Sequence, residues 1–299
     1  MTRLGLGIDA GGTATRWCLA DAEGRALAEG RADPLSGHIF SDAAEIRARQ
    51  IVEGIGAAVL ETARPDGIVA GITGLTRGAP AEALMRGLFA QALRLPPERV
   101  QIAEDMWIAY LARFRPGEGI LVYSGTGSIG YYLAPDQQAI QVGGRGNLID
   151  DGGSGFWMAR EAIKAVLRAE EEAPGSGWST PLGQALAGAI GGTSWNAIRA
   201  FVYGGDRGKI GVLARAVAEA ASDPVARAIL QAAGQELARL ANSLFKRVGP
   251  RPVAVTGRAA HLHPLILEAF RGAIPPGSEV LVADVDAAHA AARLAAALP

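Results

Sequence analysis

Two short segments of the 299-residue chain combine glycines with hydroxyl side chains in a way that suits phosphate binding. The first is DAGGT, Asp9 to Thr13, and the second is SGTGS, Ser124 to Ser128. Such turns present successive backbone N–H groups, because glycine has no Cβ and permits positive φ, and the hydroxyl adds another donor. Two of them facing each other could bind the β and γ phosphates of a nucleotide. Asp9 could hold Mg²⁺, directly or through water, since Mg²⁺ prefers carboxylate, water and phosphate oxygens.

The first segment is neither a Rossmann fingerprint nor a Walker loop, because both need a helix straight after the glycines. DAGGT is followed by TRWCLA, which is strand-like, and the Walker lysine is absent. A glycine-rich turn between two strands is, by itself, most often only a turn. The shared β context of both segments, with a third glycine turn at Thr256–Gly257 after an apolar strand, favours phosphate binding.

The elements that position these turns repeat along the chain. The order strand, glycine turn, strand, turn, strand spans residues 4–32 and again 118–144, which predicts an internal duplication. Between the copies the patterns predict helices over 42–63, 79–93 and 104–114 and strands over 67–73 and 99–103. After the second copy they predict a helix from about 154 to 172, helices to about 247, strands at 251–260 and 278–284, and a final alanine-rich helix. Alternating strands and helices indicate an α/β fold.

Composition excludes several classes of protein. Cys18 is the one cysteine, so a disulfide framework, a zinc ribbon and an iron–sulfur cluster held within one chain are excluded. The formal net charge of −1 suggests no nucleic-acid partner. No secretory pattern opens the chain, and no apolar run is long enough to span a bilayer. We expect a soluble, cytoplasmic protein with no nucleic-acid or membrane partner.

Several motifs carry a resemblance to a known family. GIDAGGTATRW resembles the first phosphate motif of the actin–hexokinase–Hsp70 superfamily, LVYSGTGSIG the second, and VAVTGRAA the adenosine motif. Together with IAEDMWIAYLARF and GGRGNLIDDGGSGFWMAREAI, their order and spacing look most like the N-acetylglucosamine kinase and BadF/BadG/BcrA/BcrD ATPase group. The resemblance covers nearly the whole chain. It implies a duplicated two-domain actin-like (ribonuclease H-like) α/β fold with a central nucleotide cleft.

The resemblance also implies domain limits and ligands. The first domain would comprise residues 1–114 with the C-terminal helix 284–299, and the second residues 115–283. ATP and Mg²⁺ are the implied cofactors, with Asp9 as the metal ligand. The implied nucleotide-binding residues are Asp9, Gly11, Gly12, Thr13, Thr15, Gly125, Thr126, Gly127, Thr256 and Gly257.

Asp105 is the candidate catalytic residue. Phosphoryl transfer needs the acceptor hydroxyl in line, the charge neutralised and a carboxylate to accept the proton. Asp105 follows the predicted strand 99–103, where a helix begins, so from position alone it could be a helix cap or a base. It matches the catalytic aspartate of the family, which favours the base, with Glu104 as the capping residue.

The acceptor pocket departs from the family pattern. Asp151 corresponds to the aspartate of a GDEGSG-like run that contacts sugar hydroxyls, but this chain reads DDGGSG. Asp150 replaces a glycine, as a second sugar ligand or, as we favour, a solvated turn residue, and Gly152 replaces the glutamate. The loop DPLSGHIF lacks the family's substrate asparagine. The candidate substrate residues are Ser36, His38, Asp105, Thr126, Gly144, Arg145, Gly146 and Asp151.

Three functions are compatible with these motifs. The first is an ATP-dependent kinase of an amino sugar, N-acetylglucosamine or glucosamine, acting at the 6-hydroxyl as the family does. The second is a BadF-type ATPase, which would need two cysteines per chain for a cluster between subunits. The third is a non-catalytic sugar-binding regulator, which usually adds a helix-turn-helix before the kinase fold, whereas this chain enters its first strand at about residue 4. A degenerate kinase stays open because of DDGGSG. The partner would be a small-molecule sugar, and a homodimer is common in the family.

Overall fold

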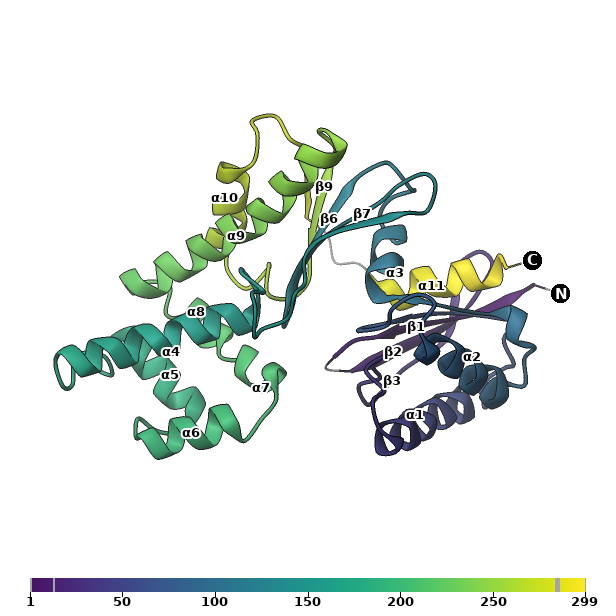
Figure 1. Cartoon of the computed structure of the whole chain (residues 1–299), viewed down its shortest axis with the longest axis horizontal. Helices are drawn as coiled ribbons and strands as arrows, with labels where there is room; N and C mark the ends of the chain where they lie inside the picture. The colour runs from purple at the N-terminus through teal and green to yellow at the C-terminus, as the bar shows by residue number, and fades with distance from the viewer. Residues whose placement is uncertain (1, 13, 283–285, 299) are drawn as a thin grey trace. The chain divides into compact units, whose positions relative to one another are not determined.

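The computed structural model describes residues 2–12, 14–282 and 286–298. The chain divides into two compact units: unit 1 is Met1–Arg115 with Val285–Pro299, and unit 2 is Pro116–Asp284 (Figure 1). Each unit contains one five-stranded sheet covered by helices. The C-terminal helix therefore returns to the sheet that the N-terminal strand begins.

Unit 1 is an α/β layer built from the first 115 residues and the last helix. Its strands are β1 (Leu4–Ala10), β2 (Thr15–Asp21), β3 (Ala26–Ala32), β4 (Gly67–Ile72) and β5 (Val100–Glu104). Its helices are α1 (Asp42–Leu60), α2 (Pro80–Leu93), the 3₁₀ turn η1 (Pro97–Arg99), α3 (Asp105–Leu111) and α11 (Ala287–Ala296).

Sheet 1 has the strand order β3-β2-β1-β4-β5. The β1–β2 and β2–β3 pairs are antiparallel, and β1–β4 and β4–β5 are parallel. The carboxyl ends of β1, β4 and β5 consequently meet at one edge of the sheet, where loops commonly carry a binding site.

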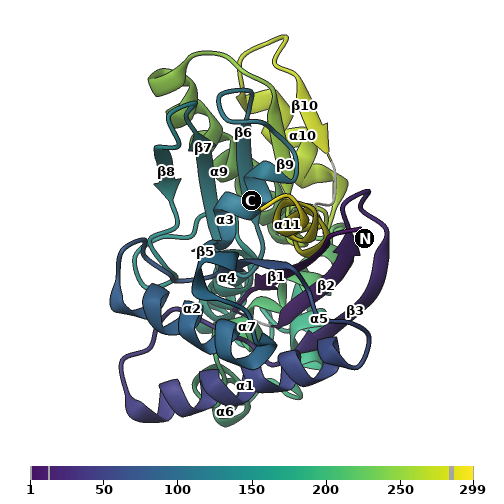
Figure 2. The same cartoon turned by 90° about the vertical axis from the view of Figure 1, so that its right-hand side faces the viewer.

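Alternation along β1 decides which helices cover which face of sheet 1. Leu6 and Ile8 point into a core that also contains residues of α1 and α2. Gly5 and Gly7 point to the other face, where a Cβ would collide with the α11 backbone, so α11 packs directly on the strand. Figures 1 and 2 both show α3 and α11 on one side of sheet 1 and α1 and α2 on the other.

Unit 2 contains the second sheet and a larger helical part. Its strands are β6 (Ile120–Ser124), β7 (Ser128–Leu133), β8 (Ala139–Gly143), β9 (Val253–Thr256) and β10 (Val280–Val282). Its helices are α4 (Gly155–Glu172), α5 (Pro181–Ile190), α6 (Trp195–Tyr203), α7 (Arg207–Gly211), α8 (Ala214–Glu219), α9 (Pro224–Val248) and α10 (Pro264–Ala273).

Sheet 2 has the order β10-β9-β6-β7-β8, with β6–β7 and β7–β8 antiparallel and β6–β9 and β9–β10 parallel. Read from the other end, this is the strand order and direction of sheet 1, with β6 in the place of β1. The predicted duplicated α/β fold is confirmed. Residue identity between the copies is low, because only buried alternation and glycine turns are needed to repeat it.

The core of unit 2 is organised by α9. Its buried side chains, among them Leu230, Leu237 and Leu244, lie in one cluster with Ile120 and Val122 of β6. Asp223 caps this 25-residue helix by accepting from the N–H groups of Val225 and Ala226. The helix gives the loops at the edge of sheet 2 a rigid support.

Candidate functional site

Asp9 and Asp105 lie next to each other at the carboxyl edge of sheet 1. Asp9 is the penultimate residue of β1 and pairs with Gly71 of β4, while Asp105 is the first residue of α3 and follows β5. A Cβ on Gly71 would lie 3.1 Å from the Asp105 Cα and 2.6 Å from the Ile108 Cδ1. The glycine therefore allows α3 to begin directly over β4, beside Asp9.

The negative charge of Asp105 affects the protonation of Asp9. The pKa of Asp9 is raised from 3.8 to about 6, first by burial and then by the negative charges of Asp105 and Asp286, against the opposing effect of Arg16. Asp105 Oδ1 accepts from the N–H of Met106 at 2.8 Å. Glu104 occupies the N-cap position of α3 without a side-chain capping bond, so it does not act as the cap we expected. A half-buried acidic pair at the end of parallel strands suits a site that handles protons or cations.

The loop predicted to contact substrate is fixed to the same edge of sheet 1. Gly37 donates to the Thr73 carbonyl at 2.9 Å, and Thr73 in turn donates to the Ala10 carbonyl at 2.9 Å. The Ser36 hydroxyl accepts from the His38 N–H at 3.1 Å, which closes a local turn. The His38 ring stacks on Phe40 with centroids 5.8 Å apart, and Phe40 is 88% exposed. The structure thus brings Ser36 and His38 to the edge that carries Asp9.

Thr15 must be removed from the predicted nucleotide ligands. Its side chain is fully buried, and its hydroxyl donates to the Asp33 carbonyl at 2.8 Å and accepts from the Leu35 N–H at 3.1 Å. Because this hydroxyl already donates its one proton inside the fold, it cannot donate a hydrogen bond to a phosphate. Thr15 instead ties β2 to the loop that carries Ser36.

The first glycine turn joins β1 to β2. Gly11 donates its N–H to the Ala14 carbonyl at 3.1 Å, and Gly12 is exposed. Thr13 lies outside the described residues. The backbone of Gly12 is therefore accessible at the end of β1, next to Asp9.

The second glycine turn, Gly125 to Gly127, joins β6 to β7. Gly125 donates to the Gly127 carbonyl at 2.9 Å, and the N–H groups of Gly155 and Phe156 at the start of α4 bond back to the carbonyls of Gly125 and Thr126. Gly127 does not have a positive φ, although glycine permits one. It is glycine for lack of space, because a Cβ there would lie 2.9 Å from the Asp151 carboxylate.

The third glycine turn lies beside the second. Thr256 ends β9 opposite Tyr123 of β6, and Gly257 has a φ of +95°. A Cβ on Gly257 would lie 2.7 Å from the Ser124 carbonyl carbon, and the Ser124 oxygen accepts from the Ala259 N–H at 2.9 Å. Only glycine fits this close approach of two backbones. Thr256 is 4% exposed, so its contribution to a ligand would come through the turn rather than its side chain.

Asp151 is buried against the second glycine turn. It is 3% exposed and adopts a left-handed backbone with φ +64°. Burial raises the pKa of this carboxyl, against the opposing effects of Arg207 and of backbone hydrogen bonds from Ser128 and Gly146. Among the described residues its Oδ2 has no hydrogen-bond partner. A buried acceptor oxygen in this state is suited to a ligand hydroxyl.

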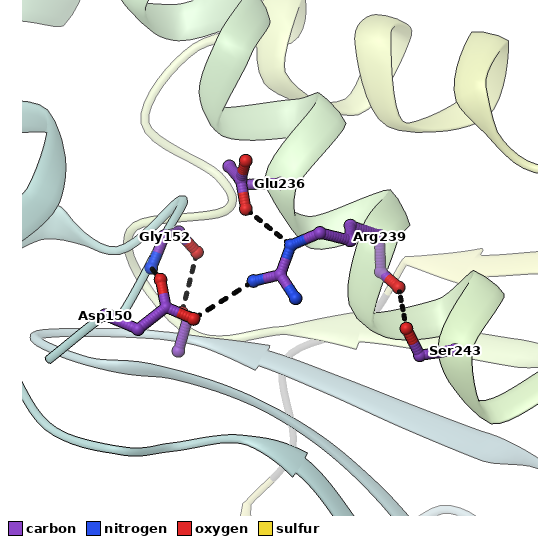
Figure 3. A network of polar contacts seen from close by, with 6 residues as sticks. Asp150, Gly152, Glu236, Arg239 and Ser243 are labelled. Atoms are coloured by element: carbon purple, nitrogen blue, oxygen red, sulfur yellow. Dashed lines mark hydrogen bonds and ion pairs between the residues drawn. The ribbon is translucent and has the colours of Figure 1, made fainter.

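Asp150 is ion-paired, not merely solvated as we favoured. Its Oδ2 accepts from Arg239 of α9 at 3.1 Å, and its Oδ1 accepts from the Gly152 N–H at 3.1 Å (Figure 3). Arg239 also donates to Glu236 at 2.7 Å. No sequence pattern pointed to Glu236 or Arg239. Arg239 and the Asp150 that it binds are 89 residues apart in the chain.

The remaining candidates lie in the loop that follows β8. Gly144 and Gly146 have φ values of +64° and +87°, which side chains other than glycine rarely adopt. Arg145 between them is exposed. The hydrogen bond from Gly146 to Asp151 places this loop against the same buried carboxylate.

The described residues contain neither a ready-made metal cluster nor a membrane-spanning helix. No cluster of three or more His, Cys, Asp or Glu side chains in residues 2–12, 14–282 and 286–298 could hold a metal ion by itself. Within those ranges, no helix combines the length and hydrophobicity that a membrane-spanning segment requires.

Comparison with a family model gives a match over residues 6–292 to the BadF/BadG/BcrA/BcrD ATPase family. The predicted resemblance is confirmed. A curated relative from Clostridium acetobutylicum, an N-acetylmuramic acid/N-acetylglucosamine kinase, is 28% identical over 168 residues, 54% of this chain and 53% of that protein. The match thus spans about half the length of that relative.

Solved structures extend the similarity to the whole chain. A protein from Chromobacterium violaceum, described as a candidate N-acetylglucosamine kinase, is 27% identical with a TM-score of 0.73 over 99% of both chains. A ROK family glucokinase from Streptomyces griseus, solved with glucose and AMPPNP, is 20% identical with a TM-score of 0.63 over 98% of both chains. At that identity the second comparison shows the fold alone.

Proposed function

We propose that this chain, which belongs to the BadF/BadG/BcrA/BcrD ATPase family, is an ATP-dependent sugar kinase. Its acceptor would be an amino sugar, N-acetylglucosamine or glucosamine, phosphorylated at the 6-hydroxyl. The proposal is supported by similarity along the whole chain to a candidate N-acetylglucosamine kinase.

The pairing of Asp9 with Asp105 across Gly71 is the observation on which the proposal depends. The proximity of the two carboxylates does not itself stabilise the fold, since the negative charge of Asp105 raises the pKa of Asp9, although Asp105 Oδ1 also accepts from the first-turn N–H of Met106. Two adjacent carboxylates with different surroundings can divide the work of phosphoryl transfer between them.

Asp105 would act as the general base. It would accept the proton of the acceptor hydroxyl as that oxygen bonds to the γ-phosphorus and the bond from phosphorus to the ADP oxygen breaks. Its first-turn position in α3, supported by the Gly71 contact, holds the carboxylate on a rigid element. The proton then resides on the Asp105 carboxyl and is released to solvent, and the products are ADP and a sugar phosphate.

Asp9 would hold Mg²⁺, directly or through water. The donor set fits the ion, because a divalent cation would offset both the burial of this carboxylate and its repulsion with Asp105. When bound, the ion would neutralise charge on the phosphates. Gly12 of the first glycine turn and Thr126 and Gly127 of the second would donate backbone N–H groups to them, with Gly257 beneath the adenosine. Gly11 and Gly125, whose own N–H groups bond to the carbonyls of Ala14 and Gly127, would shape the two turns.

Asp151 would bind the acceptor sugar. Its buried Oδ2 has no hydrogen-bond partner in the part of the chain that the structure describes. It can therefore accept from a sugar hydroxyl, whereas leaving it unpaired is costly. Ser36, His38, Gly144, Arg145 and Gly146 remain candidate substrate contacts.

The alternative of a BadF-type ATPase has no support from the cysteine. Cys18 is 2% exposed within sheet 1, so it is unsuited to ligate a cluster shared between subunits. The test below distinguishes a kinase from an ATPase.

A phosphotransfer panel tests the proposal. Purified protein with ATP and Mg²⁺ would be mixed with N-acetylglucosamine, glucosamine, N-acetylmannosamine, N-acetylmuramic acid, glucose or no sugar. We expect ADP release with one amino sugar far above the sugar-free control. Equal release in every tube would instead indicate an ATPase. No release in any tube, together with nucleotide binding by calorimetry, would contradict the kinase proposal.

A further inference from the structure

Asp151 lies in a turn, residues 150–153, that contains two residues with a left-handed backbone. Asp151 has φ +64° and Gly153 has φ +80°. A left-handed conformation is unfavourable for an aspartate and persists only when the surroundings fix it. What holds this turn therefore determines where the Asp151 carboxylate lies.

Sheet 2 holds the turn from one side. The Ser124 hydroxyl donates to the Gly153 carbonyl at 2.8 Å, and the Ser128 hydroxyl donates to the Gly152 carbonyl at 2.7 Å. Both serines are buried, so these bonds are shielded from water. They fix the carbonyls, but not the Asp150 side chain.

Helix α9 holds the turn from the other side. A Cβ on Gly153 would lie 2.6 Å from the Ala233 carbonyl, so turn and helix are in direct backbone contact. Nearly two turns further along α9, Arg239 donates both to Asp150 and to Glu236 (Figure 3). Asp150 also accepts from the Gly152 N–H, which joins the ion pair to the turn's own backbone.

Because Gly152 has no side chain, the side chain of Glu236 can lie against it. A Cβ at this position would lie 2.7 Å from the Glu236 Oε2 and 3.1 Å from its Cγ. The helix thus supplies a carboxylate over the turn where a side chain of residue 152 would otherwise project. Arg239 connects that carboxylate to Asp150, and the three side chains form one network.

We propose that Arg239 is a positioning residue: by bridging Asp150 and Glu236 it clamps the 150–153 turn to α9 and so holds Asp151 against Gly127 for the acceptor. The proposal rests on the proposed function for the role of Asp151, but the clamp itself does not. Because the three side chains are partly exposed, the pairs are weak singly and act as a network.

Arg239→Ala tests the proposal, with Arg227→Ala, an exposed arginine on the same helix, as the matched control. We expect faster hydrogen exchange of residues 146–156 and, with N-acetylglucosamine as the probe, a KM about ten-fold higher. The KM for ATP should stay unchanged. Arg239→Lys should lie between the two, since a lysine cannot offer the planar fork of donors that spans two carboxylates.

A double variant separates positioning from general stability. In an Asp151→Asn background, Arg239→Ala should cause no further loss of N-acetylglucosamine affinity by calorimetry, because Arg239 acts through Asp151. An additional loss there would contradict the proposal, as would faster exchange with an unchanged KM. Unchanged exchange in residues 146–156 would overturn the clamp itself. Should the wild type neither bind nor phosphorylate the sugar, the proposed function fails and the positioning proposal fails with it, while the exchange experiment still decides the clamp.

Discussion

Sheet 1 and sheet 2 share one strand order, but the buried carboxylates at their edges, Asp9 and Asp151, have different surroundings. At the edge of sheet 1, Asp9 faces another negative charge, Asp105, and is left with a raised pKa. At the edge of sheet 2, Asp151 is enclosed by backbone hydrogen bonds, a glycine turn and a clamped loop. The duplicated scaffold thus supports an edge that suits charge and proton transfer and another that suits fixed recognition.

The largest effect should come from the acidic edge. Asp105→Asn is expected to lower kcat at least a thousand-fold, because the amide cannot accept the hydroxyl proton. Nucleotide affinity by calorimetry and the far-UV circular dichroism should remain those of the wild type. Asp66→Asn is the control, since Asp66 accepts from Leu4 at the opposite edge of sheet 1. Turnover within ten-fold of wild type would remove Asp105 from the role of base.

The same substitution in the two glycine turns should separate ligand effects from packing effects. Gly127→Ala places a methyl group 2.9 Å from the buried Asp151 carboxylate and should destabilise the protein by about 1–3 kcal/mol. In Gly11→Ala the nearest atom is the Ala14 oxygen at 3.4 Å, an ordinary contact, so stability should hardly change. Thermal unfolding and nucleotide titration measure both. Loss of nucleotide affinity in a stable Gly11→Ala would assign the first turn to phosphate binding, and unchanged affinity would exclude it.

Asp9→Asn should make the protein without nucleotide more stable at neutral pH. The folded-state pKa of Asp9, about 6, lies above 3.8, so the protonated carboxyl is the form that folding favours. Its stabilising contribution is complete below pH 3.8 and is lost as the pH rises through 6. At pH 7.5 the variant should therefore gain about 1–3 kcal/mol, and the gain should shrink towards pH 4. Urea unfolding at both pH values, with Asp42→Asn as control, measures this; a less stable variant at pH 7.5 would contradict the account.

The smallest effect concerns Cys18, which reports on sheet 1 alone. The pKa of its thiol is raised to about 12, first by burial and then by the negative charge of Glu29. Because the thiolate is the reactive form, labelling by a disulfide reagent at pH 8 should be slow and should follow the opening of unit 1. The urea-unfolded chain provides the full-reactivity control. Immediate labelling of the folded protein would show that this face of sheet 1 is more open than the structure has it.

Alternation and glycine placement were enough to predict the strands of both sheets, the helices of unit 1 and the strand end that Asp105 follows. Helix α10 was not predicted, and Asp151 was identified through the family resemblance. These features depend on residues close in sequence. Thr15 was misassigned because a hydroxyl beside a glycine turn looks the same in sequence whether it points outward or bonds Asp33 and Leu35. Glu236 and Arg239 could not be predicted, since their contact with residue 150 depends on the register of α9 against a distant loop. The role of Gly71 could not be predicted either, because the lack of room for a side chain there becomes evident only when α3 packs over β4.

The most direct test of the central claim is the ratio of sugar phosphate formed to ADP released by the wild-type protein. It would be measured by mass spectrometry and a coupled ADP assay, with ATP, Mg²⁺ and the preferred sugar of the panel. A kinase with Asp105 as base and Asp151 on the acceptor predicts one sugar phosphate for each ADP. ADP release with no sugar phosphate would contradict that account and identify the activity as ATP hydrolysis.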